Sequence, residues 1–176
     1  FQKTAMAHMG PNLFIASRAT IAALTLFPIA VFVQRSTANR AHDPAGLIRI
    51  ALLGGVLFFI GAVTQQVGLV TATVTNAGFL NGLYVIFTPL VAWLVNGIMP
   101  NRVVWPAIAA SFVGAWLLGG GTLGSFSAGD GLIALCSIFW AAHVVATGRA
   151  STYGNPFFFT ALQFAVVAVL AGAAAF

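Results

Sequence analysis

The feature that most constrains this chain is its series of long apolar segments separated by short polar ones. A helix that crosses a bilayer needs about 20 residues, and it satisfies every backbone N–H and C=O group within its own segment. Six segments meet these requirements, near residues 12–34, 47–69, 73–96, 103–120, 131–149 and 156–176. We therefore predict an all-α fold, a polytopic bundle of transmembrane helices. Pro11 and Pro156 suit first turns of helices, and Asp130 suits an N-cap.

The composition supports a membrane protein rather than a soluble one. Of the 176 residues, 60% are hydrophobic and only 5% are charged, whereas about one quarter of an ordinary soluble domain is charged. So few polar side chains cannot cover a globule of this size in water. The excess of basic residues forms no stripe with interleaved aromatic residues, so nucleic-acid binding is not predicted.

The basic residues predict the orientation of the bundle. One side holds five arginines, Arg35, Arg40, Arg49, Arg102 and Arg149, and the other side has only Lys3 near a helix end. The arginine side is predicted to be cytoplasmic, in a multi-pass protein of the cell inner (plasma) membrane. An odd number of helices, most simply one, should then precede residue 12. Because the chain begins with Phe1 and stops inside an apolar stretch, we interpret it as a piece of a longer protein.

A faint internal repeat fits this orientation. At an offset of about 145 residues, four residues near the first span meet identical residues near the last, and Arg18 meets Gln163; the four pairs are Pro11 and Pro156, Phe14 and Phe159, Ala16 and Ala161, and Ala23 and Ala168. The two copies lie in helices of opposite direction, as in the inverted-topology repeats of secondary transporters, and the period implies roughly 290 residues in all.

Arg18 stands inside the first span, about two turns from its start. A charge at the centre of such a helix costs about 2.5 to 3.5 kcal/mol on insertion scales, so the side chain should face a cavity, a partner or the interface. Two interpretations remain open. The guanidinium attracts an anionic or carboxylate-bearing substrate, or it is a structural group that bonds backbone carbonyls or snorkels outward.

The second and third spans hold further candidates for a cavity. In the second span, one helical face is formed by Gly54, Gly61, Gln65 and Gly68. Its glycines suit close packing of a neighbouring helix, and Gln65 is the one polar side chain that could reach a cavity. The third span is the most polar, and its members Asn81, Tyr84 and Thr88 share a face. Pro89 removes a backbone bond and can kink that helix. Bonding between helices explains half of these polar residues, and Asn81 and Tyr84 are the candidates for the cavity.

The fifth span carries an aromatic and titratable stripe made of Cys136, Trp140, His143 and Thr147. An aromatic wall beside an imidazole suits a ligand pocket, and a histidine can also relay a proton. The alternative is a neutral histidine that bonds across the bundle. Cys136, the only cysteine, is interpreted as a small packing residue.

Catalytic and metal-binding patterns are missing from the sequence. The chain has no Glu, and its two carboxylates, Asp43 and Asp130, are predicted to lie at opposite membrane surfaces. No Ser-His-Asp set, phosphate-binding loop or HExxH motif occurs, and His8, His42 and His143 lack metal-ligand spacing. We predict neither an enzyme nor a protein with a metal or cofactor.

Several motifs resemble those of a known family. Residues 76–90, AsnAlaGlyPheLeuAsnGlyLeuTyrValIlePheThrProLeu, resemble the fourth-helix signature of EamA-type transporters of the drug/metabolite transporter superfamily. Residues 1–3 resemble the end of the first helix of the family, and Arg18 matches the arginine of its second helix. The opening of the second repeat is similar to residues 129–130 and 139–143. One departure is that Ile98 follows Gly97, where the family commonly has Gly-Glu, so the family's cytoplasmic gating contacts are not assumed.

The resemblance implies ten helices in two inverted five-helix repeats with both chain ends in the cytoplasm. Residues 1–125 would hold most of the first repeat, with helices two to five, and residues 126–176 would hold helices six and seven. It also implies export or exchange of small metabolites, often amino acids or drugs, by alternating access. By motif position, it adds Asn76 to the candidate cavity residues Arg18, Gln65, Asn81, Tyr84, Trp140 and His143.

Two other functions stay open. A membrane-embedded enzyme acting on lipid-linked substrates would need acid, base or metal-binding residues clustered at one surface, and the six spans supply almost none. A helical scaffold or facilitator without a coupled cycle would lack saturation and trans-stimulation. The predicted partners are a small-molecule substrate and the lipid bilayer, and a homodimer is left open.

Overall fold

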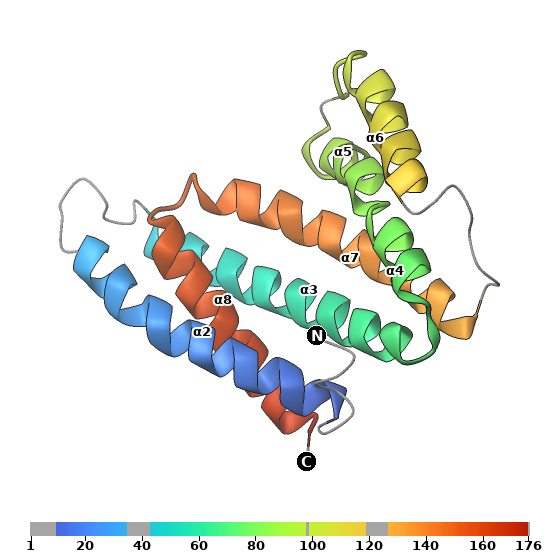
Figure 1. The fold of residues 1–176 in the computed structure, drawn as a ribbon. Helices are drawn as coiled ribbons and strands as arrows, with labels where there is room; N and C mark the ends of the chain where they lie inside the picture. The colour runs from blue at the N-terminus through green and yellow to red at the C-terminus, as the bar shows by residue number, and fades with distance from the viewer. Residues whose placement is uncertain (1–9, 35–42, 98, 119–126, 176) are drawn as a thin grey trace. The chain divides into compact units, whose positions relative to one another are not determined.

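The computed structural model describes residues 10–34, 43–97, 99–118 and 127–175, and these contain helices and no strand. The helices are α2 (Pro11–Gln34), α3 (Pro44–Thr71), α4 (Val74–Asn81), α5 (Tyr84–Asn96), α6 (Val104–Leu118), α7 (Ala128–Ala150) and α8 (Pro156–Ala173), drawn in Figure 1. The predicted all-α class is confirmed, and so are helix starts at Pro11 and Pro156. Lys3, Arg35 and Arg40, used for the orientation, lie outside the described residues.

Five helical stretches of the described chain are long and apolar enough to cross a membrane: α2, α3, α4 with α5, α7 and α8. These correspond to five of the six predicted spans. The remaining predicted span, 103–120, is helical as α6, but its 15 described residues fall short of the about 20 that span a bilayer. By length and composition, the described residues therefore form a bundle of membrane-spanning helices.

The chain divides into two compact units. Unit 1 consists of residues Phe1–Val63 and Ala146–Phe176, and unit 2 consists of residues Thr64–Val145. Helices α3 and α7 each contribute residues to both units.

In unit 1, α2 and α8 lie side by side in opposite directions (Figure 1). The side-chain amide of Asn12 at the start of α2 donates to the carbonyl oxygen of Ala174, just after the end of α8, at 2.8 Å. The core next to this pair consists of Leu47, Ala51, Ala150 and Phe159. A large ring at Phe159 packs here because the facing helices carry small residues.

Glycines bring α3 close to α8, as predicted for the glycine face of the second span. A Cβ at Gly54 would lie 3.1 Å from the ring of Phe159, and one at Gly55 would lie 2.7 Å from the side chain of Val166. Van der Waals packing holds helices together in lipid, so a close approach strengthens the association. Packing therefore explains Gly54 without a functional role.

Short polar residues begin the helices of unit 1. Asp43 precedes α3, and its Oδ1 accepts a hydrogen bond from the amide of Gly46 at 2.9 Å. Asn155 precedes α8, and its Oδ1 accepts from the amide of Phe157 at 2.9 Å. These caps satisfy amides that have no partner within their own helix.

In unit 2, α3 and α7 approach backbone to backbone. A Cβ at Gly68 would lie 2.8 Å from the carbonyl oxygen of Gly129, and a Cβ at Gly129 would overlap that of Gly68. The third predicted span is divided into α4 and α5 by a break at Gly82 and Leu83. Pro89, where a kink was expected, lies inside α5.

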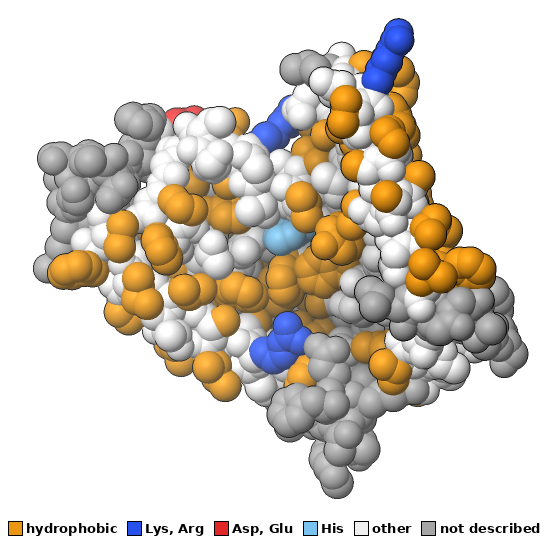
Figure 2. All heavy atoms as spheres, turned by 45° about the horizontal axis from the view of Figure 1, so that its top comes forward, with side chains coloured by type: hydrophobic (Ala, Val, Ile, Leu, Met, Phe, Trp, Pro, Cys, Tyr) orange, Lys and Arg blue, Asp and Glu red, His pale blue; other side chains and the backbone are white. Residues whose placement is uncertain are grey.

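Large apolar side chains cover much of the described surface, and hydrophobic atoms spread widely over the face in Figure 2. The most exposed include Leu24, Phe32, Leu94 and Val169, each with at least 70% of its side chain accessible. A soluble monomer rarely exposes contiguous apolar area of this extent. Such a surface suits contact with lipid or with further helices of the same bundle.

Candidate functional site

The break between α4 and α5 exposes backbone polar atoms inside an apolar segment. The amide of Leu83 bonds to the carbonyl of Leu80 at 3.2 Å, and the amide of Val85 bonds to that of Gly82 at 3.1 Å. Both bonds reach three residues back instead of four. Among the described residues, the carbonyl oxygens of Phe79 and Asn81 therefore lack the amide partners that a regular helix would supply.

Asn81 ends α4 and faces α7. The thiol of Cys136 lies 3.6 Å from the Oδ1 atom of Asn81, and Cys136 is fully buried, as expected of a packing residue. One turn further along α7, the rings of Trp140 and His143 meet edge to face with centroids 5.9 Å apart. The structure thus brings Asn81 to the aromatic and titratable stripe of the fifth predicted span.

Tyr84 opens α5 on the other side of the break and is half-buried. Its carbonyl oxygen accepts a hydrogen bond from the hydroxyl of Thr88 at 2.7 Å. Asn81 and Tyr84 stand on either side of the turn at Gly82 and Leu83. Residues three apart stay aligned in a turn whose bonds reach three residues back, so the shared face of Asn81, Tyr84 and Thr88 stays a prediction.

A cavity of about 100 Å³ adjoins the break in unit 2. Its lining is mostly apolar and consists of Phe79, Gly82, Val85, Ile86, Ile108, Ser111 and Phe112. The rings of Phe79 and Phe112 meet edge to face with centroids 4.7 Å apart. The break therefore borders both an apolar cavity and, through Asn81, the stripe on α7.

Asn76 lies in a buried polar cluster near the start of α4. It is fully buried, and its amide bonds to the hydroxyl of Thr73 at 3.1 Å. Its side chain lies beside the carboxylate of Asp130, whose Oδ2 accepts hydrogen bonds from the amide and the hydroxyl of Ser127, the latter at 2.9 Å. Asn76 is thus placed to hold α4 against the start of α7.

Asp130 differs from its sequence-based prediction. It was expected as an N-cap at a membrane surface, yet it is the third residue of α7 and is 1% exposed. Ser127 stands directly before the helix and donates both its amide and its hydroxyl to the carboxylate of Asp130, and the amide bond is one half of a capping box. The motif Ser-x-x-Asp at 127–130 was the signal for this cap.

The glutamine that the structure buries is not the one selected from the sequence. Gln65 is half-buried, whereas its neighbour Gln66 is 3% exposed and its Oε1 atom has no hydrogen-bond partner among the described residues. Gln66 shares a face of α3 with the buried residues Ala62 and Leu69. The apolar residues on that face could have predicted the burial of Gln66 from the sequence. The face that carries the glycines led to the selection of Gln65 instead.

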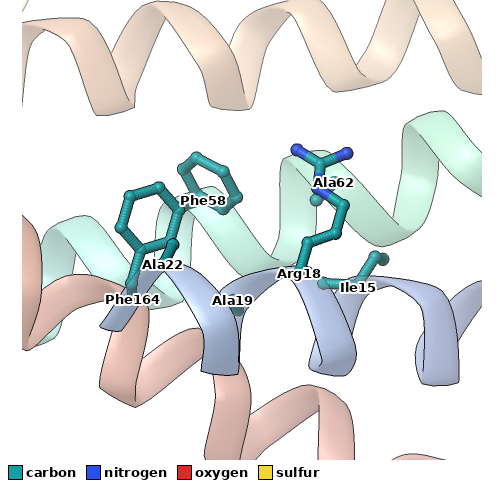
Figure 3. Close-up of a pocket in the computed structure, with 7 residues that line it drawn as sticks. All are labelled: Ile15, Arg18, Ala19, Ala22, Phe58, Ala62 and Phe164. Atoms are coloured by element: carbon teal, nitrogen blue, oxygen red, sulfur yellow. The ribbon is translucent and has the colours of Figure 1, made fainter. Parts of the chain in front are cut away.

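Arg18 belongs to unit 1 and borders a second cavity, of about 110 Å³, between α2, α3 and α8. In Figure 3 its side chain extends from α2 toward α3, while the rings of Phe58 and Phe164 lie together on another side. The guanidinium carbon lies 5.5 Å from the ring centre of Phe14, within the range of a cation–π contact. The geometry places this arginine at a pocket wall.

No group of three or more His, Cys, Asp or Glu side chains that could hold a metal ion occurs in the described ranges. The polar groups that unit 2 does assemble are an amide, a thiol, an indole and an imidazole, from Asn81, Cys136, Trp140 and His143. Such a set can orient an organic ligand through hydrogen bonds and ring contacts.

Comparison with known proteins places this geometry in context. Residues 1–120 match the EamA-like transporter family. An "Uncharacterized transporter" of Archaeoglobus fulgidus is 33% identical over 102 residues, which are 58% of this chain and 32% of that protein. The matched part thus spans about a third of that relative's length. No solved structure matches the chain.

Proposed function

Because this chain belongs to the EamA-like transporter family, we propose that it forms part of a secondary transporter that moves a small organic molecule across the inner membrane. The observation that carries the proposal is the divided helix α4–α5, with Asn81 at its break facing Cys136 of α7. Substrate sites of secondary transporters are typically formed by such discontinuous helices, whose free backbone groups bind the cargo.

The proposed substrate site in unit 2 combines three kinds of contact. The break supplies carbonyl oxygens and the amide of Asn81, and α7 supplies the indole of Trp140 and the imidazole of His143. Tyr84, half-buried at the start of α5, adds a phenol on the other side of the break. We assign Asn76 and Gln65 to the surroundings of this site.

The transport cycle follows from the proposed repeats. Residues 1–125 form most of one repeat and residues 126–176 begin a second, inverted one. The repeats rock against each other and expose the site to each side in turn. Cargo of the amino-acid or drug class fits the proposal, with export as the direction.

Counterflow by the full-length protein in proteoliposomes tests the proposal. A panel of radiolabelled amino acids, organic acids and cationic drugs is offered outside vesicles loaded with the same compound, with and without a pH gradient. Saturable uptake stimulated from the opposite side is expected, and Asn81→Ala, Trp140→Ala and His143→Ala should each reduce it by tenfold or more.

Val144→Ala is the matched control, since Val144 adjoins His143 on α7 but is 41% exposed. It should keep the wild-type rate. Uptake that neither saturates nor responds to internal substrate would support a facilitator instead. Equal loss in Val144→Ala and His143→Ala would contradict the proposed site.

A further inference from the structure

We infer that the pocket at Arg18 in unit 1 is a second site for the transported molecule, in addition to the proposed site of unit 2, and that it binds the carboxylate of a small organic anion with a short apolar body. This inference rests on the proposed transport function. It concerns a site made only of residues from α2, α3 and α8.

The donors of Arg18 make no hydrogen bond within the part of the chain that the structure describes. A guanidinium carries five N–H donors, yet no hydrogen bond or ion pair joins Arg18 to any described residue, and its contact is with the ring face of Phe14. A structural arginine inside a membrane span is expected to pair or to bond backbone carbonyls. The side chain is also exposed, so its donors are accessible to a ligand.

No described side chain of unit 1 neutralises the positive charge at the pocket. The described carboxylate of that unit, Asp43, caps the start of α3 by accepting a hydrogen bond from the amide of Gly46. Ala62 of α3, which lines the pocket, lies 19 residues after Asp43, the residue directly before that helix. At 1.5 Å per residue, the two are about 28 Å apart along the axis, so Asp43 cannot pair with Arg18.

The remaining lining selects an apolar body. Phe58 and Phe164 pack edge to face at 5.3 Å between ring centroids, and the small side chains of Ala19 and Ala22 also line the pocket. An engineered apolar cavity of about 150 Å³ holds benzene. The pocket of about 110 Å³ therefore suits a branched chain of four or five carbons.

The single positive charge of Arg18 balances a monocarboxylate, whereas a dianionic phosphate would keep one negative charge uncompensated. The planar fork of an arginine donates two parallel hydrogen bonds to the two oxygens of a carboxylate. The contact of the guanidinium with the ring of Phe14 uses none of its N–H donors in a hydrogen bond to a described residue. The pocket therefore matches a monocarboxylate with an apolar body.

The test measures equilibrium binding of radiolabelled 3-methylbutanoate to the full-length protein in neutral detergent. Its amide, 3-methylbutanamide, has the same carbon skeleton without the charge and should compete at least tenfold less well, since bonds to charged groups are the stronger ones. Arg18→Gln should abolish this preference, and Arg18→Lys should keep part of it. Ser17→Ala is the matched control, because that hydroxyl bonds to Leu13 of its own helix.

A second variant keeps the charge and narrows the cavity. Ala22→Val should weaken binding of 3-methylbutanoate severalfold and leave binding of acetate unchanged. Equal competition by the acid and the amide, or wild-type preference in Arg18→Gln, would overturn the inference. A third outcome would also overturn it. If anionic phospholipid displaces the probe from wild type at a lower concentration than the unlabelled acid does, and does not do so in Arg18→Gln, then Arg18 binds a lipid headgroup.

Counterflow separates this inference from the proposed function. Transport of neutral or cationic cargo that is unchanged in Arg18→Gln would leave the transporter standing and overturn the anion site. Binding of the acid that depends on Arg18, together with no counterflow of any compound, would keep the site and refute transport.

Discussion

The backbone contact between α3 and α7 predicts a large difference between two glycine substitutions on one helix. At Gly129, an added Cβ would overlap the carbonyl oxygen of Gly68 and the hydroxyl of Thr71, and it would lie 2.8 Å from the amide nitrogen of Ala72. At Gly131, two residues along α7, an added Cβ meets nothing within 4 Å. Gly129→Ala should therefore destabilise the protein, and Gly131→Ala should not.

The magnitude follows from what the two variants share. Replacing a helical glycine by alanine gains about 0.5 to 1 kcal/mol of intrinsic helix stability at both positions. Their difference is therefore the overpacking cost at Gly129, about 1 to 3 kcal/mol. Two of the three crowded atoms are backbone atoms, which cannot rotate away. We expect about 3 kcal/mol, roughly a hundredfold in the unfolding equilibrium.

Unfolding of the full-length protein in mixed micelles, followed by tryptophan fluorescence against denaturant, measures this difference. Gly129→Ala should unfold at clearly lower denaturant than wild type, and Gly131→Ala at the same concentration or higher. Stabilities of the two variants that agree within about 0.5 kcal/mol, the usual scatter of surface substitutions, would refute the close approach of α3 and α7.

Three further substitutions are expected to lower the free energy of unfolding in the same assay. Phe159→Ala empties a site that is 2% exposed and should cost about 3 kcal/mol, the low end for such truncations because lipid also solvates apolar groups; Phe157→Ala, at a 44% exposed position, should cost far less. Asn155→Ala removes the bond to the amide of Phe157 and should cost about 1 kcal/mol, whereas Asn155→Ser should recover most of it. Ser127→Ala removes the hydroxyl bonded to Asp130 and should cost about 1 kcal/mol; a wild-type value would show that the amide of Ser127 alone holds this carboxylate.

The helices could be predicted from the sequence because their formation in lipid is local. The predicted second span, 47–69, lies within the observed α3, and the predicted first span, 12–34, matches α2 to one residue at its start. Each helix bonds its own backbone, so an apolar run of sufficient length is enough to predict it. The starts at Pro11 and Pro156 were predicted for a similar reason, since proline suits the first turn.

The division of the third span could not be predicted in the same way. Proline pointed to Pro89, but the bonds that reach three residues back occur at Gly82 and Leu83. Glycine permits such a turn without requiring it, because its conformational freedom favours no single geometry. Whether the turn forms depends on the helices that pack on both sides of it.

The surroundings of polar side chains were the least predictable from sequence. Asp130 looked like a surface cap and is buried, and Gln66 is more deeply buried than the selected Gln65. Helical spacing identifies which residues share a face, but it does not tell which face another helix covers. Arg18 shows the same limit, since the pocket that it lines together with Phe164 forms only with α8 in place.

The sequence by itself determined that this chain forms apolar helices of membrane-spanning length, and its motifs indicated the family. Only the tertiary structure decided that α2 and α8 lie antiparallel around the Arg18 pocket and that Asn81 faces Cys136 across a break. The reason is physical. Backbone hydrogen bonds within a helix join residues four apart, whereas the contacts that build a site join residues far apart in the chain.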